Sequence, residues 1–165
     1  MKKLFVMLML LAPMATFAQK FGHVDLQVIQ QTMPEISKVN GELEALQKQY
    51  TNELQAMYEE IQRKDQAYQQ AASTMNETQK KEKETELQGL MDKFQQAQQD
   101  NANAFQKAQQ EKMQPIQDKI FKAIENVGKA GGYVYIMQVG SLPYISSTLS
   151  TDVTSAVKAE LAKLK

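Results

Sequence analysis

Apolar residues recur every three or four positions through the middle of the chain, which predicts an amphipathic helix with a narrow coiled-coil stripe. One stripe position holds Lys64 instead of an apolar residue. From Tyr50 to Ile61 the spacing follows an 11-residue pattern, which relaxes the supercoil. The positions of this first stripe are Ile36, Val39, Leu43, Leu46, Tyr50, Leu54, Met57, Ile61, Tyr68, Ala72 and Met75.

A second stripe of comparable length follows the first and is interrupted at Asn101. Each stripe is too narrow to be buried alone, so the two predict helices that pack on each other as an antiparallel hairpin. Pro115 lies within the second helix and predicts a kink there. The positions of the second stripe are Leu87, Met91, Phe94, Ala97, Phe105, Ala108, Met113, Ile116, Ile120, Ile124 and Val127.

The apolar pattern lapses between Met75 and Leu87, where the charged stretch ETQKKEKETE replaces it. A Thr-x-x-Glu sequence there fits a capping box, and an Asn-x-x-Gln sequence two residues later is a second, weaker version. These signals predict a hairpin tip over residues 73–78, while one continuous helix is the alternative. The tip residues are Ser73, Thr74, Asn76, Glu77 and Thr78.

The C-terminal part has the signals of strands and one short helix. GKAGGY provides a Gly for a left-handed cap of the second long helix. YVYIMQV and LPYIS, joined by Gly140 and Ser141, predict a β-hairpin with a two-residue turn. Asp152 or Thr154 then caps a final helix. One face of that helix carries Val157, Leu161 and Leu164.

The N-terminal part predicts a strand at FGHVDL and a short helix capped by Asp25, with Pro34 in the first turn of the long helix. The fold class is therefore mainly α with a small β body, into which a long antiparallel helical hairpin is inserted. We place the body at residues 19–34 and 115–165 and the arm at residues 35–114. Because one body is small, we expect several chains to pool their strands into one closed core. The residues expected in this pooled body core are Val24, Tyr133, Tyr135, Ile136, Tyr144 and Ile145.

The first 18 residues predict a secretory signal peptide, with two basic residues, an apolar core and small residues before a cleavage site after Ala18. A retained membrane anchor is the alternative. Without Lys2 and Lys3, 17 basic residues face 19 acidic ones, a formal charge of −2 that argues against a dedicated nucleic-acid binder. The absence of Cys excludes disulfides from the sequence.

The sequence contains no constellation typical of an enzyme. His23 is the only His and there is no Cys, which excludes a multi-His metal site and a thiol nucleophile. No phosphate-binding loop or dinucleotide fingerprint occurs. The carboxylates of EKETE lie at the predicted tip and are expected to face solvent. We therefore expect no catalytic residues, no cofactor and no metal.

With these elements in order, the chain resembles the Skp/OmpH family of periplasmic chaperones. FGHVDLQVIQQTMPEISKV is similar to the family's N-terminal strand, short helix and Pro before the first arm helix. MQPIQDKIFKAIENVGKAGGYVYI is similar to the helix that returns to the body, and STDVTSAVKAEL to the closing helix. The resemblance covers essentially the whole chain after the signal peptide.

This resemblance implies a periplasmic homotrimer with a shared β-barrel body and three arms around a cavity. It implies an ATP-independent holdase that binds unfolded outer-membrane proteins, prevents their aggregation and delivers them for insertion. Family members are often basic, whereas here Lys80, Lys81, Lys83 and Lys93 are offset by neighbouring carboxylates. No lipopolysaccharide site is therefore carried over, and peripheral contact with membrane or lipopolysaccharide stays open.

The alternative function is a structural coiled-coil adaptor of the cell envelope, which would bind a folded partner through its arm tip. For the chaperone, residue type and off-seam position suggest a set of client-binding side chains, because Met and Tyr adapt to varied partners. The competing interpretation is that the Met residues only fill the hairpin seam. The set comprises Met57, Tyr58, Tyr68, Met75, Leu90, Met91 and Phe94.

Overall fold

The computed structural model describes residues 19–164, which divide into two units. The arm comprises Gln30–Ile120, and the body combines the residues up to Ile29 with those from Phe121 onward. The sequence pattern alone predicts these borders at 34/35 and 114/115. The predicted signal peptide lies outside the described residues. Within residues 19–164, no helix has the length and apolar character needed to span a membrane.

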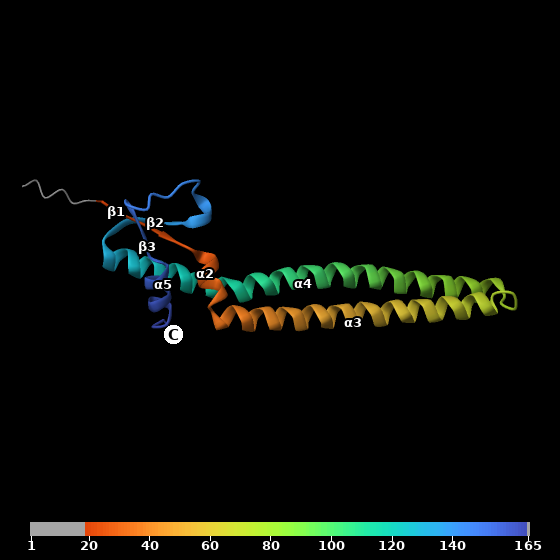
Figure 1. Ribbon diagram of the computed structural model, residues 1–165. Helices are drawn as coiled ribbons and strands as arrows, with labels where there is room; N and C mark the ends of the chain where they lie inside the picture. Colours follow the sequence, from red (N-terminus) through yellow and green to blue (C-terminus); the bar gives the residue numbers. More distant parts are fainter. Residues whose placement is uncertain (1–18, 165) are drawn as a thin grey trace, which may run out of the picture. The chain divides into compact units, whose positions relative to one another are not determined.

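The arm is the predicted antiparallel hairpin, with its two helices side by side (Figure 1). Helix α3 covers Pro34–Ala71 and begins with the proline at its first turn, where the missing N–H costs no hydrogen bond. Helix α4 covers Glu77–Gly131 and continues past Pro115, so the kink expected there stays a prediction. The short loop between Ala71 and Glu77 confirms a hairpin over a continuous helix.

The hairpin buries few side chains for its length. Over its 38 residues, α3 fully buries only Leu43 and Ile61. On α4, Ile116 and Ile120 are 6% and 3% exposed. The remaining stripe positions are half-buried, except Met91, which is 51% exposed, so the seam between the helices is as narrow as the sequence pattern predicts. Polar bonds between the helices supplement this small apolar contact.

The body contains a three-stranded sheet in the order β2-β1-β3. Strand β1, Lys20–Val24, lies in the centre and pairs in parallel with β2, Tyr133–Gln138, and with β3, Ser150–Asp152. Gly22 lies opposite Ile136, and a Cβ at Gly22 would come within 3.0 Å of the Ile136 side chain. This close approach favours glycine in the central strand.

The predicted β-hairpin after Tyr133 is wrong. After β2 the chain enters a short 3₁₀ helix, Val139–Ser141, in which the Leu142 N–H donates to the Val139 carbonyl. In the described chain, residues 142–149 contain no strand, because Pro143 lacks an N–H and the Ser146 hydroxyl accepts bonds from the next turn. Strand β2 therefore finds its partner in β1, more than one hundred residues earlier.

Helix α2, Leu26–Gln31, and helix α5, Thr154–Leu161, begin with the acceptors that the sequence suggested. Asp25 accepts a bond from the Val28 N–H at 3.1 Å, and Asp152 accepts one from the Thr154 N–H at 2.9 Å. The Thr154 hydroxyl does not cap its own helix, because it accepts a bond from the Asp25 N–H at 3.0 Å instead. This bond ties the end of β1 to the start of α5.

The core of the body forms where these elements meet. Val24, Ile29 and Val157 are its largest fully buried side chains. Leu161 is also buried, whereas Leu164 lies beyond the end of α5 and is half-buried. Gly132 ends α4 with φ = 66°, the left-handed cap that GKAGGY predicts.

Candidate interaction surface

Across residues 19–164, no three His, Asp or Glu side chains lie together as a cation site. His23 is half-buried in β1, where its Nδ1 lies 2.8 Å from the Ser150 hydroxyl of β3. This contact within the sheet gives His23 a structural role.

An apolar patch lies across the two arm helices around Tyr58 and Phe94. Their rings are 6.3 Å apart at the centroids and tilted by 42°, so the pair links α3 to α4. Tyr58 is 47% exposed. Met91, one turn before Phe94 on α4, is 51% exposed, and Leu90 is half-buried. Four of the seven predicted client-binding residues therefore gather in one place, which we call the mid-arm patch.

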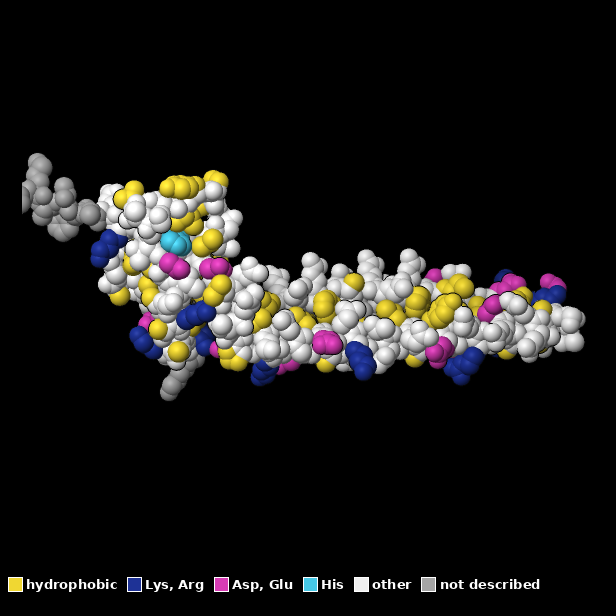
Figure 2. Space-filling model, in the orientation of Figure 1, with side chains coloured by type: hydrophobic (Ala, Val, Ile, Leu, Met, Phe, Trp, Pro, Cys, Tyr) yellow, Lys and Arg dark blue, Asp and Glu magenta, His cyan; other side chains and the backbone are white. Residues whose placement is uncertain are grey.

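The mid-arm patch has the chemistry of an adaptable contact surface. Tyr and Phe present large rigid faces, and the unbranched Met side chain adjusts to the shape of its partner. Beneath the patch, Ile61 is 8% exposed and contributes to the seam. Figure 2 shows hydrophobic side chains in separate groups along one face of the arm, with polar side chains between them.

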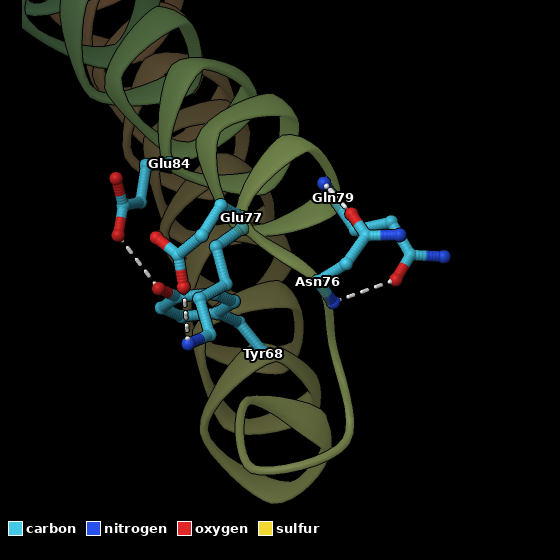
Figure 3. A network of polar contacts seen from close by, with 6 residues as sticks. Tyr68, Asn76, Glu77, Gln79 and Glu84 are labelled. Atoms are coloured by element: carbon cyan, nitrogen blue, oxygen red, sulfur yellow. Dashed lines mark hydrogen bonds and ion pairs between the residues drawn. The ribbon is translucent and has the colours of Figure 1, made fainter.

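The other three predicted client-binding residues are half-buried. Met57 is half-buried in α3, and Met75 is half-buried in the tip loop. Tyr68 donates its hydroxyl proton to Glu84 on α4 at 2.7 Å, and this hydrogen bond raises the pKa of Tyr68 (Figure 3). Tyr68 thus joins the two helices close to the tip.

The tip is capped by the pair that sequence reasoning ranked second. Asn76 Oδ1 accepts a bond from the Gln79 N–H at 2.9 Å, and Gln79 Oε1 accepts one from the Asn76 N–H at 3.0 Å (Figure 3). Thr74 instead donates its hydroxyl to the Ala71 carbonyl at the end of α3. The Thr74–Glu77 capping box is wrong because α4 begins at Glu77, which leaves Asn76 at the capping position. Ser73 and Thr78 are exposed beside it.

Charged side chains of the arm pair across the seam. Glu86 is held between Lys64 of α3 and Lys83, and these bonds lower the pKa of Glu86 to about 2. Bonds from Lys112 and Lys119 likewise lower the pKa of Glu42 and of Glu35. The cross-seam pairs are Lys64–Glu86, Lys112–Glu42 at 2.5 Å and Lys119–Glu35 at 2.7 Å. Such pairing neutralises these three carboxylates locally, while residues 30–120 together hold 15 acidic and 11 basic side chains, an excess of acidic charge.

The body exposes a second apolar surface. Of the predicted core residues, Val24 is buried, while Tyr133, Ile136 and Ile145 are half-buried. Tyr135 and Tyr144 are 51% and 78% exposed in the single chain, and Tyr135 stacks on Phe21 at 4.8 Å. Other exposed apolar side chains of the body are Val134, on the opposite face of β2 from Tyr135, Val139 and Leu149. Figure 2 shows hydrophobic side chains gathered on one side of the body.

A hollow between the arm helices, whose nearest lining residues lie one turn from the mid-arm patch, was not predicted from the sequence. It has a volume of about 340 Å³ and includes Tyr50 and Leu54 of α3 and Phe105 of α4 in its lining. The signal was present in the sequence, because Asn101 interrupts the second apolar stripe at this level. A polar residue in a seam marks a place where the two helices do not close on each other.

Comparisons with known proteins agree on one family. The model of the family described as outer membrane protein (OmpH-like) matches residues 20–161. The chaperone protein Skp of Yersinia enterocolitica is 29% identical over 157 residues, which cover 92% of this chain and 93% of that protein. The crystal structure of an OmpH-like protein from Caulobacter crescentus matches with a TM-score of 0.75 at 16% identity, over 89% of this chain and 86% of that one.

Proposed function

The chain belongs to the OmpH family of outer membrane chaperones, and from this premise we propose that it is a periplasmic holdase. It binds outer-membrane proteins while they are unfolded, keeps them from aggregating and releases them for membrane insertion without ATP. The similarity to a protein named as the chaperone Skp supports this function. A holdase acts through contact surfaces and needs no catalytic residues. The apolar patches that the arm exposes suit this role.

The observation that carries the proposal is the mid-arm patch. Tyr58 and Met91, about half exposed, lie on a hairpin that is held together by its own seam. Exposed apolar surface lowers the solubility of the arm. Such surface favours contact with the apolar side chains of a partner. Each contact of this size is weak, so a client is held by several contacts acting together.

We further propose that three chains associate through their bodies. The sheet order leaves β2 and β3 each with one edge that no other strand of the described chain covers. Tyr135 of β2 and Tyr144, in the segment after β2, expose apolar side chains of the body. Pairing of such edges between chains closes a sheet into a barrel and removes exposed edges. Three arms around one cavity then provide the several contacts that weak binding needs.

The test is aggregation of an unfolded β-barrel membrane protein as its denaturant is diluted in the presence of the purified chain. We expect light scattering to fall in proportion to the chaperone added. Unchanged scattering would refute the holdase function. Joint replacement of Ser73, Thr74 and Thr78 by Ala serves as the control: a holdase keeps its activity, whereas an adaptor that binds through the tip loses its partner.

A further inference from the structure

We propose that the hollow between the arm helices captures one apolar side chain of an extended, uncharged stretch of client polypeptide. The amide side chains at its rim would hydrogen-bond the client backbone on either side of the captured residue. This inference rests on the proposed chaperone function and gives it a defined site. The site lies wholly within the arm, between α3 and α4.

The hollow exists because large side chains are missing from the seam at this level. On α4, the stripe position is Asn101, whose Nδ2 lies 3.4 Å from Glu53 Oε2, and its neighbour is the small Ala102. On α3, Thr51 donates its hydroxyl to the Gln47 carbonyl at 2.9 Å and so bonds to its own helix. No large apolar side chain from these positions reaches across, which leaves an apolar floor of Tyr50, Leu54 and Phe105 uncovered.

The lining selects a polypeptide over other apolar ligands. All of its residues are uncharged, which disfavours anionic lipids and charged segments. Its rim carries the amides of Gln47, Gln98 and Asn101. A primary amide both donates and accepts hydrogen bonds, as the peptide group does, whereas an acyl chain can use neither. An apolar floor with an amide rim therefore matches an apolar residue on an extended backbone.

The spacing to the mid-arm patch defines the client sequence further. Tyr58 lies one turn beyond Leu54 on α3, and Phe94 one turn before Gln98 on α4. The lining spans residues 47–54 of α3 and 98–105 of α4. Its centre is therefore about seven to eight residues, or about 11 Å along the helix axis, from the aromatic pair. In an extended chain, side chains four residues apart point the same way and are about 13 Å apart. A membrane-barrel strand, with apolar residues at alternate positions, supplies such a pair.

The first experiment fills the hollow. Ala102→Leu places a larger side chain in the lining, and Ala104→Leu is the matched control, exposed on the same helix but outside the lining. The probe is a synthetic peptide of about 10 residues with alternating Ser and apolar positions, including one Trp and a Leu four residues away. The chain has no Trp, so Trp fluorescence reports the peptide alone.

We expect Ala102→Leu to weaken peptide binding roughly threefold to tenfold, and Ala104→Leu to leave it unchanged. Asn101→Leu restores the apolar stripe, so it should raise the unfolding midpoint of the arm and weaken the binding of the peptide. If the hollow is only a packing defect that binds nothing, Asn101→Leu would raise the unfolding midpoint without weakening peptide binding. That result would overturn the proposal. Equal binding by wild type and Ala102→Leu would overturn it as well.

Crosslinking gives a readout that does not depend on filling the hollow. Because the chain has no Cys, Thr51→Cys and Asn52→Cys each introduce a single thiol, the first in the lining and the second outside it. A peptide with a thiol-reactive group at its Trp position should label the first and spare the second. Equal labelling of the two thiols, with client aggregation still suppressed, would refute binding at the hollow but not the chaperone function. A wild-type chain that suppresses no aggregation would refute the chaperone function itself.

Discussion

The cap at the arm tip allows a sharp test, because the structure assigns it to one pair of residues. Asn76→Ala removes the acceptor of the Gln79 N–H but keeps the backbone N–H that donates to the Gln79 side chain. One of two reciprocal bonds is therefore lost. Replacing an Asn N-cap by Ala costs about 1 kcal/mol, which for a chain of this size lowers the melting temperature by about 3 °C.

The comparison that decides the assignment is Thr74→Ala. The Ala71 carbonyl, which accepts the Thr74 hydroxyl, also accepts the Thr74 backbone N–H at 2.9 Å. The carbonyl keeps a partner in the variant, so an effect within about 0.5 kcal/mol is expected at this exposed position. Asn76→Asp preserves an acceptor at the N-cap and should stay close to the wild type.

Urea unfolding followed by helical circular dichroism measures the free energy of unfolding of each variant. Hydrogen exchange at the amides of residues 77–80 locates the change, because loss of the cap frays the first turn of α4. If Thr74→Ala destabilises the protein as much as Asn76→Ala, α4 begins earlier than the structure places it and the assignment of the cap is refuted.

Three further predictions concern acid stability, the body turn and the body core. The carboxyls of Glu35, Glu42 and Glu86 have pKa values below the usual range, about 2 for Glu86. Their bonds therefore add stability above the unfolded pKa of about 4.3, which is lost as pH falls towards 2. Urea midpoints from pH 7 to pH 2.5 should show this loss, with a shallower fall for Glu86→Gln. Gly132→Ala forces a side chain into a backbone with φ = 66° and should cost about 1 kcal/mol by thermal unfolding, whereas Lys129→Ala in the last turn of α4 should cost less. Val157→Ala leaves a cavity at a fully buried site and should cost about 2 kcal/mol, against a negligible change for exposed Ser155→Ala.

The arm could be predicted from sequence because its rules are local. Stripe spacing and the lapse before Leu87 define two helices and a turn, and Pro34 and Gly132 mark helix ends by their backbone preferences. The exact cap was missed because Thr74 and Asn76 each head a plausible box. Only the position at which α4 begins decides between them.

The body was harder to predict because its sheet is built from distant pairs. Gly140 and Ser141 carry a genuine hairpin signal, yet β2 pairs with β1, and the register His23–Asp152 joins strands at opposite ends of the chain. No local pattern encodes such pairing. The hollow was missed for a related reason, because Asn101 reveals a break in one helix and says nothing of what faces it on the other.

The central position of β1 has a consequence for the order of folding. Lys20 pairs with Tyr133, so the first strand to be synthesised waits for more than one hundred residues before its partners exist. Closing so long a loop as a flexible coil is slow. Helices α3 and α4 form from local contacts, and their pairing, with Glu35 beside Lys119, brings the two flanking segments close together. The paired arm helices would thus first hold together the segments from which the protein's own sheet is assembled.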